Sequence, residues 1–487
     1  MHHLISYAPG TLTRRTLLTC SAAAWCVHSM AEAHAAEASI AGAIASAAAR
    51  LPPAPPAEVA ERTAWTLADV MGAMLYASTL PEAIEVAQFF ARGSRSDEAF
   101  VPATDLSATE MQAAAATAFL IHAAEIDDSD LRGQLRASAV IMSSSLAAAQ
   151  AANASGVEFL RAAALGYTLQ GRFAAPVGAI QAHGWMASGV WGPPAGAAAV
   201  ALLRRQSAEE LASAISLAGA ASGGLFQYYF DQTEEKRLIV ARAARAAVES
   251  AELAELGERG ASRIIEGKAG LFRLFGGVES PPADYFTAGL EALEGPLFVR
   301  PKYFSASHSI IPTLEGLIAA APQGIDAAAV ERVIIKGDPA WGSVIGAKIN
   351  DFEAPVTPIG AALNFSFVIA LWIIRGSVLP ADYTDETMRD DRILNLARKF
   401  EFQTVQGEHL SIEVQMKSGE AIRAAAADPS PDEPAPLETE RRIAKFDGLA
   451  GARLTKAKCE DLREHCLSVG EARSMREWMR RTRAICA

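Results

Sequence analysis

The residues best suited to chemistry form a compact acidic cluster in the first third of the chain. Glu125, Asp127 and Asp128 are followed by the hydroxyl of Ser129. The preceding Ala-rich run, 111–124, is typical of a helix, so the cluster would lie at a helix end. Carboxylates this close repel one another. The residues alone leave two interpretations open: a solvated helix terminus, or a site for acid–base or cation-binding work.

Lys236 is the candidate cation for such a site. It follows an acidic patch that includes Glu234 and Glu235, and it opens an Ala-rich run typical of a helix. An ammonium at a helix N-terminus does not help to stabilise the helix, which suggests that Lys236 binds a carboxylate. The alternative is an ordinary surface lysine.

Composition and charge exclude several classes of function. About half of the 487 residues are apolar and the formal net charge is −12, with no basic run beyond the N-terminus. A nucleic-acid partner is therefore not expected. Apolar runs in the body are too short to span a membrane. Metal-ligand spacings, phosphate loops and dinucleotide-binding glycine motifs are missing from the sequence, so we predict neither a metal nor a cofactor.

The N-terminus, residues 1–35, has the layout of a twin-arginine signal peptide. Arg14 and Arg15 precede a weakly apolar stretch, and small-residue cleavage patterns end at Ala33 and Ala35. We expect the twin-arginine export machinery to deliver the protein to the periplasm, with no membrane attachment after cleavage. The alternative is a mispredicted start codon or a disordered tail.

Three cysteines would remain after cleavage: Cys459, Cys466 and Cys486. The first two are seven residues apart, which is too far along a helix for a disulfide between them. Pairing of Cys486 in an oxidising compartment stays open. We favour the simpler interpretation, in which all three are small apolar side chains.

Local patterns predict a mainly α protein with a second α+β domain, that is, a large helical domain plus a smaller inserted α+β lid domain. Capping boxes predict helix starts at 107–110 and 207–210. Alternation predicts strands at 330–336, 410–416 and 421–425, with helices at 361–375 and 390–397 between them. The predicted segments are a signal (1–35), an Ala/Pro-rich linker (36–57), a helical domain (58–296), an α+β lid domain (297–436) and C-terminal helices that rejoin the helical domain (437–487).

Several motifs, in order along the chain, resemble those of the MmgE/PrpD (2-methylcitrate dehydratase) family, which includes cis-aconitate decarboxylase and iminodisuccinate epimerase. His122-Ala-Ala-Glu-Ile-Asp-Asp-Ser129 is similar to the family's His-x-x-Asp-Phe-Asp-Asp-Thr. Gly184-Trp-Met-Ala-Ser-Gly-Val-Trp-Gly192 is similar to Gly-Phe-His-x-Thr-Gly-x-Phe-Gly, and Glu235-Lys236 to the family's Thr-Lys. The resemblance covers about residues 60–480, and its specificity lies in the ordered series.

The resemblance implies a helical domain, a lid-like α+β domain, an active site between them and a homodimer. It also implies cofactor-free lyase or isomerase chemistry on a small di- or tricarboxylate, in which a base, an acid and cations cooperate. The residues that it makes candidates for catalysis are Glu125, Asp128, Lys236 and His308, to which we add His183 because of its position near Met186. The candidates for substrate binding are Asp127, Ser129, Met186, Ser188, Arg300 and Lys302.

The chain departs from the family at positions that matter for proton transfer. The family's His-Pro falls on Leu135-Arg136, and the His of its Gly-Phe-His falls on Met186. Leu and Met cannot transfer protons, and losing an acid–base imidazole costs roughly 10²–10⁴-fold each. His183, three residues before Met186, could partly replace the lost imidazole, or be a solvated or capping residue. The family's second lysine has no clean match: spacing places it on Val299, with Arg300 and Lys302 nearby.

Two functional hypotheses follow. The first is an enzyme of the dehydratase, decarboxylase or epimerase type with a divergent site. The second is an inactive family member that binds a small anionic ligand in the periplasm. Arg132 and Arg136, which follow the acidic cluster, favour the second. Tyr228 and Tyr229 would line the wall of the cleft or the subunit interface.

Overall fold

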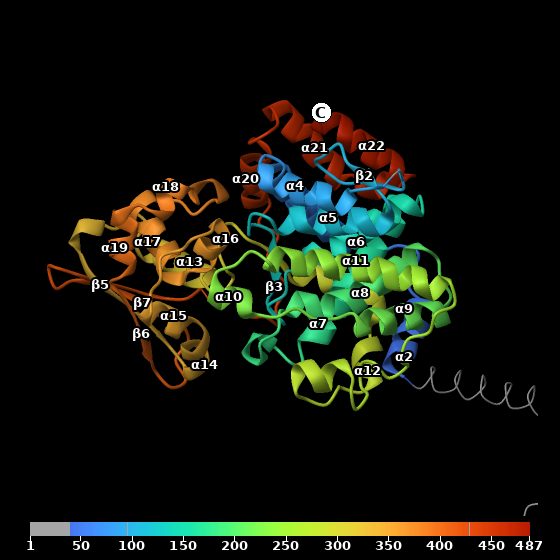
Figure 1. The fold of residues 1–487 in the computed structure, drawn as a ribbon, viewed down its shortest axis with the longest axis horizontal. Coiled ribbons are helices and arrows are strands. Elements are labelled where there is room, and N and C mark those ends of the chain that lie inside the picture. The colour runs from blue at the N-terminus through green and yellow to red at the C-terminus, as the bar shows by residue number, and fades with distance from the viewer. Residues whose placement is uncertain (1–38, 95, 428) are drawn as a thin grey trace, which may run out of the picture.

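The computed structural model describes residues 39–94, 96–427 and 429–487, so the predicted signal segment lies outside the described residues. The larger part, the helical body, is built on seven long helices (Figure 1). They are α3 (Ala57–Ala77), α5 (Glu110–His122), α6 (Ala137–Ala151), α7 (Gly156–Ala174), α8 (Ala187–Leu203), α9 (Ala208–Ala220) and α11 (Lys236–Glu255). α11 lies against α5, α8 and α9.

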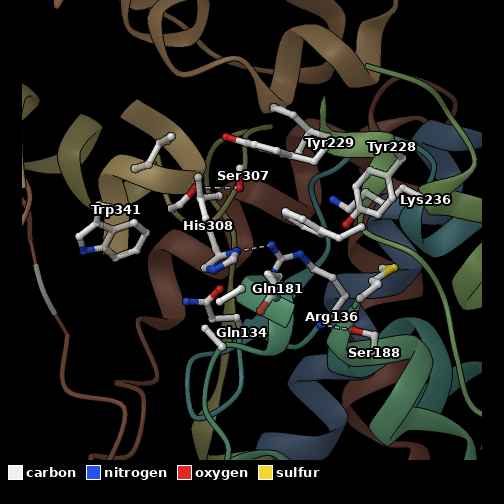
Figure 2. Close-up of a pocket in the computed structure, with 18 of the residues that line it drawn as sticks. Gln134, Arg136, Gln181, Ser188, Tyr228, Tyr229, Lys236, Ser307, His308 and Trp341 are labelled. Carbon is white, nitrogen blue, oxygen red and sulfur yellow. Dashed lines mark hydrogen bonds between the residues drawn. The ribbon is translucent and has the colours of Figure 1, made fainter. Parts of the chain in front are cut away.

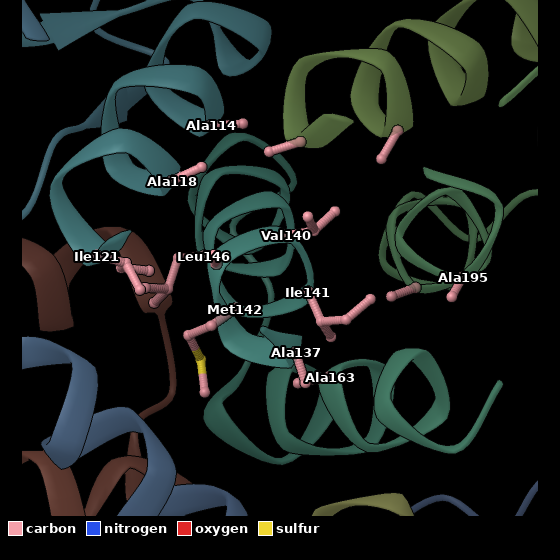
Figure 3. Close-up of a cluster of buried hydrophobic side chains, with 14 of the residues drawn as sticks. Ala114, Ala118, Ile121, Ala137, Val140, Ile141, Met142, Leu146, Ala163 and Ala195 are labelled. Atoms are coloured by element: carbon pink, nitrogen blue, oxygen red, sulfur yellow. The ribbon is translucent and has the colours of Figure 1, made fainter. Parts of the chain in front are cut away.

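Small residues let these helices approach closely. Every residue of α6 from Ala137 to Gln150 is buried, so α6 is surrounded on all sides. A Cβ added at Gly166 of α7 would come within 2.7 Å of Ile141, and one at Gly192 of α8 within 3.0 Å of Val140. Figure 3 shows Val140 and Ile141 of α6 among alanines of the neighbouring helices. The many alanines and glycines are thus a packing requirement rather than a sign of a flexible chain.

One predicted helix start is confirmed and the other is wrong. The capping box at Ser207 and Glu210 opens α9 as predicted. α5 instead begins at Glu110, where the Thr109 side chain accepts from the backbone of Gln112. Ser107 lies in a short strand, β2 (Ser107–Ala108), which pairs with β1 (Ala99–Phe100), so its backbone is extended.

The segment predicted as a linker, 36–57, contains a buried helix. α2 (Ile40–Ala48) begins after Ser39, and Ile40 and Ile44 are buried. α2 packs against α9 and α12 (Ala283–Thr287). Its Ala-rich composition suggested a spacer, but two isoleucines four residues apart give the helix an apolar face that the body covers.

The α+β unit (residues 299–427) contains the predicted strands. Its sheet has the order β6 (Phe400–Thr404), β5 (Val330–Gly337), β7 (Ser411–Met416) and β8 (Ala421–Ala425). β5 pairs parallel with β6 and antiparallel with β7, which forms the predicted hairpin with β8. Helices α13 (Ile311–Ala320), α17 (Phe365–Arg375) and α19 (Asp391–Ala397) share an apolar core with the sheet. The helix predicted at 361–375 is two helices, because Asn364 ends α16 (Pro358–Leu363) and caps α17.

Two connections tie the α+β unit to the helical body. β3 (Asp128–Asp130), in the body, pairs antiparallel with β4 (Val299–Pro301), so Ser129 faces Arg300. After the α+β unit, α20 (Thr439–Ala450) and α21 (Lys456–Leu467) pack on α3, and α22 (Met475–Cys486) packs on α6 (Figure 1). The cysteines of these helices, Cys459, Cys466 and Cys486, are buried and free. Among the described residues, none of the helices has the length and apolar character needed to cross a bilayer.

The start of α7 provides a test of how the C-terminal segment docks. A Cβ at Gly156 would lie 1.7 Å from the backbone oxygen of Val469, which cannot move without shifting its chain. We expect Gly156→Ala to lower the free energy of unfolding by about 1–3 kcal/mol in urea denaturation, as overpacking does. Gly448→Ala, in α20, is the control, because a Cβ there meets no atom within 4 Å. Equal stability of the two variants would contradict this docking.

Candidate functional site

A buried carboxylate, Glu125, is the centre of the site. After α5 ends at His122, the chain turns through Glu125 with a φ of 52°, a left-handed conformation uncommon outside glycine. One carboxylate oxygen accepts from Lys302 at 2.7 Å, and the other accepts from Lys236. The Nε of Arg136 lies 3.7 Å away. Burial alone would raise the pKa of Glu125, but Lys236 and Lys302 hold it well below its usual value, so Glu125 is ionised.

The three cations reach Glu125 from separate elements. Lys236 is the first residue of α11, and Arg136 immediately precedes α6. Lys302 follows β4, where its backbone amide donates to the carbonyl of Asp127 at 3.0 Å and prolongs the β3–β4 pairing. The strand pair therefore places the Lys302 ammonium over the acidic cluster.

Asp127 has a structural role. It accepts from the Nδ1 of His122 at 2.8 Å, and Lys302 lies 3.5 Å from its other oxygen. Burial works against ionisation, but His122 and Lys302 lower the pKa of Asp127. Lys445 donates to the Asp127 carbonyl at 3.2 Å and pairs with Asp69 at 2.7 Å. Asp127 thus anchors the turn after α5 to the C-terminal helices.

The pKa of Asp128 shifts in the opposite direction from that of Asp127. Burial, and then the neighbouring Asp127, raise its pKa to about 7. One oxygen accepts from the backbone of Ser138 at 3.2 Å, and the other has no partner among the described residues. Asp128 does not line the pocket described below, so the structure does not place it where the predicted catalytic base would act.

Arg136 fixes the state of His308. The Arg136 guanidinium contacts the Nδ1 of His308. A guanidinium can only donate, so Nδ1 must accept, and the imidazole is neutral with its proton on Nε2. Burial and then Arg136 lower the pKa of His308 well below its ordinary value, in agreement with a neutral ring. The Nε2 atom is buried and has no partner among the described residues, so its proton is not used within the described chain.

A cavity of about 180 Å³ opens beside these residues (Figure 2). Its polar lining comes from Gln134, Arg136, Gln181, Ser188, Lys236, Ser307, His308 and Ser309. Its larger apolar side chains are Met186, Phe226, Tyr228, Tyr229, Trp341, Val344, Ile345 and Leu363. The lining includes two cationic side chains and neither Asp nor Glu, which suits an anionic ligand.

The structure brings most of the predicted site residues together. Met186, Ser188, Lys236 and His308 line the cavity, while Glu125, Asp127, Ser129 and Lys302 lie behind its polar end. Ser129 and Ser188 hold Arg136: the Ser129 hydroxyl accepts from its guanidinium at 3.0 Å, and the Ser188 hydroxyl accepts from its backbone at 2.7 Å.

Two predicted residues lie elsewhere. His183 is exposed and contacts the carbonyl of Phe275 at 3.2 Å, because the turn of 180–183 directs its ring to the surface. It therefore does not replace the missing imidazole. The Arg300 guanidinium donates to the carbonyls of Ser430 and Glu433 and does not line the cavity. Arg132 likewise turns away and pairs with Asp130 at 2.5 Å.

Several lining residues were not predicted from the sequence. Ser307 and Ser309 flank His308, and this neighbourhood could have suggested them. Gln134, with a φ of 54°, precedes Arg136 by two residues. Trp341 lies about two hundred positions from the acidic cluster and carries no local signal. The contact of Arg136 with His308 also joins distant positions, and only the fold reveals it.

The described part of the site does not offer a set of side chains arranged to bind a metal ion. Over the described ranges, no group of three or more His, Cys, Asp or Glu side chains has the arrangement of a metal site. The carboxylates of Glu125 and Asp127 already face lysines.

Comparisons with known proteins agree with the motif series. The chain matches the MmgE/PrpD N-terminal domain over residues 38–283 and the MmgE/PrpD C-terminal domain over 304–468. It is 22% identical over 386 residues to a cis-aconitate decarboxylase of Aspergillus terreus (strain NIH 2624 / FGSC A1156), a match that covers 73% of this chain and 78% of the relative. A second cis-aconitate decarboxylase of Aspergillus terreus matches to the same extent. The two family domains together span most of the chain, which belongs to the MmgE/PrpD family.

Proposed function

We propose that this protein is an enzyme of the dehydratase, decarboxylase or epimerase type that moves a proton next to the carboxylate of a small organic acid. The observation that carries the proposal is a cavity lined by two cations, Arg136 and Lys236, and by the neutral imidazole of His308. Family membership and the similarity to cis-aconitate decarboxylases support a carboxylate substrate.

The charge balance of the site favours an anion. With Lys236 protonated, three cations (Arg136, Lys236 and Lys302) surround two ionised carboxylates (Glu125 and Asp127), so the buried network carries 3 − 2 = +1. With Lys236 unprotonated the network is neutral, and Arg136 is the cation that faces the cavity. The substrate carboxylate would neutralise the excess charge of the protonated state. Arg136 is suited to hold it, since its guanidinium is already fixed by Ser129, and since it would also stabilise negative charge that develops on the carboxylate during proton removal.

Lys236 is the proposed base. Burial lowers its pKa to about 7, with Arg136 and Lys302 adding to the effect and Glu125 opposing it. A fraction of the amine is therefore unprotonated near neutral pH and can accept the proton from the carbon next to the bound carboxylate. Glu125 is a poor base by comparison, because three cations keep it ionised at low pH.

His308 is the proposed hydrogen-bond donor to the leaving group. Its Nε2–H can donate a hydrogen bond to a leaving hydroxyl, and protonated Lys236 can pass on the proton that it took from carbon, so the hydroxyl departs as water and the imidazole stays neutral. In decarboxylation or epimerisation, the protonated Lys236 would return a proton to carbon instead. His308 cannot be held as an imidazolium, because Arg136 faces its Nδ1.

A second candidate is an inactive protein that binds a small anion in the same cavity. Leu135 and Met186 stand where the family motifs have histidines, and neither can transfer a proton. The cations of the cavity would serve this function equally well, so only measured turnover separates the two.

Solvent exchange tests the base. The mature protein would be incubated in D₂O with a panel of mono-, di- and tricarboxylic acids, and exchange of the hydrogen next to the carboxylate would be followed by NMR. We expect exchange with the wild type and a loss of about 10²–10⁴-fold in Lys236→Met. Lys268→Met, at an exposed lysine, is the matched control. Ligand binding without exchange in the wild type supports the inactive binder, and undiminished exchange in Lys236→Met refutes the assigned base.

The pH profile gives a second test. A base must be unprotonated, so the rate is expected to rise with pH through about 7, the pKa to which burial lowers Lys236. Lys302 contributes to this lowering, so Lys302→Met should move the inflection to higher pH. His308, whose pKa lies well below its usual value, stays neutral over this range and adds no inflection. A flat profile between pH 6 and 8.5 would contradict the assignment.

We also propose that the protein acts in the periplasm as a homodimer, on the strength of its N-terminal sequence and its family. Replacement of Arg14 and Arg15 by lysines should retain the protein in the cytoplasmic fraction of a Gram-negative host. Sizing of the mature protein by light scattering tests the dimer. Unimpaired export of the double-lysine variant would count against the twin-arginine route.

A further inference from the structure

The cationic groups of the cavity are confined to one end. Lys236 and Arg136 are its cationic lining residues, and Lys236 is already paired with Glu125. Lys302, the third cation of the network, lines a different cavity, and Arg300 donates to backbone carbonyls. In Figure 2 Trp341 lies on the opposite side of the cavity from Lys236. One carboxylate of a ligand can therefore be neutralised at this end, whereas a second carboxylate would meet no cation elsewhere in the lining.

Aromatic and aliphatic side chains form the rest of the wall. Phe226 stacks on Tyr229, with ring centroids 5.1 Å apart and planes at 13°, which makes a flat and stiff surface. Tyr228 and Tyr229 remain neutral phenols, because burial raises the pKa of each far above its usual value. Trp341 and Val344 contribute from the α+β unit. A second carboxylate placed here would lose its hydration without a compensating partner, which is costly.

Two polar atoms without partners point to one neutral polar group on the ligand. The Nε2 of His308 is a donor, and the Oε1 of Gln181 is a buried acceptor. Both residues line the cavity between Lys236 and Trp341 (Figure 2). A hydroxyl or carbonyl on the ligand can use the donor, and a hydroxyl can use both.

We infer that the cavity takes a monocarboxylate joined to an apolar, ring-sized body, and not a di- or tricarboxylate. The inference rests on the proposed function for the place of the carboxylate, at Arg136. The apolar body lies against Phe226, Tyr229 and Trp341, where its burial supplies roughly 25 cal/mol per Å² of apolar surface removed from water. With Lys236 protonated, the network's charge of +1 matches a single carboxylate, and with Lys236 unprotonated Arg136 is the one cation of the lining that can hold it.

Calorimetric titration with three probes tests the inference: 3-phenylpropanoate, glutarate and propane-1,2,3-tricarboxylate. We expect 3-phenylpropanoate to bind the mature protein at least about tenfold more tightly than either polycarboxylate. Trp341→Ala should weaken the phenyl probe by about tenfold and leave glutarate binding unchanged, whereas Arg136→Gln should weaken all three. Phe89→Ala, at an exposed ring outside this cavity, should change none.

A gain-of-function variant guards against simple loss of folding. Val344→Lys places an ammonium on the apolar wall, at a half-buried position from which it can reach the cavity. The preference should then shift toward glutarate. Tighter binding of a polycarboxylate by the wild type, or binding of none of the probes, overturns the inference.

The proposed function fails separately from this inference. If the wild type prefers phenyl acids but exchanges no hydrogen in D₂O, the inferred ligand class stands and the proposed reaction is refuted. If the wild type prefers polycarboxylates and exchanges their hydrogens, the proposed reaction stands and the inferred ligand class is refuted.

Discussion

The ion cluster around Glu125 is the interaction on which the site depends. Taking a carboxylate and its cations out of water costs several kcal/mol per ion, and the attraction in the interior offsets this only with good geometry. Lys236 lies at the start of α11, Lys302 lies just after β4, and Glu125 lies in the turn after α5. The cluster thus fastens three elements at one point. Burial lowers the pKa of Lys236 in this cluster to about 7, with Glu125 opposing the shift and Arg136 and Lys302 adding to it.

Residues of both the helical body and the α+β unit line the cavity. Arg136, Ser188 and Lys236 come from the helical body, whereas His308 and Trp341 come from the α+β unit. The β3–β4 pair crosses between the two parts, and the Arg136–His308 contact adds a second crossing a short distance away. A change in how the two parts meet would alter the carboxylate end and the apolar wall together, so binding and the state of His308 are physically coupled.

Local signals were enough for much of the fold and for part of the site. Alternating apolar residues predicted β5, β7 and β8, and the Ala-rich run after Lys236 predicted a helix, which is α11. α2 was missed, because a short Ala-rich segment beside prolines looks like a spacer until the surface that covers it is known. His183 was wrongly placed, since proximity in sequence says nothing about which way a turn directs a side chain. The place of Trp341 in the cavity could be recognised only from the tertiary structure, because no local pattern marks this residue.

The departures from the family motifs have a common consequence. Leu135 and Met186 remove two groups that could exchange protons, and Arg136 cannot replace them, because a guanidinium keeps its proton at any physiological pH. What Arg136 does instead is hold the proton of His308 on Nε2. Among the groups lining the cavity, Lys236 then has the pKa closest to neutrality, at about 7. The divergence therefore leaves the Lys236 amine as the group that takes up and releases a proton, and His308 as a neutral hydrogen-bond donor. The remaining walls of the cavity are apolar.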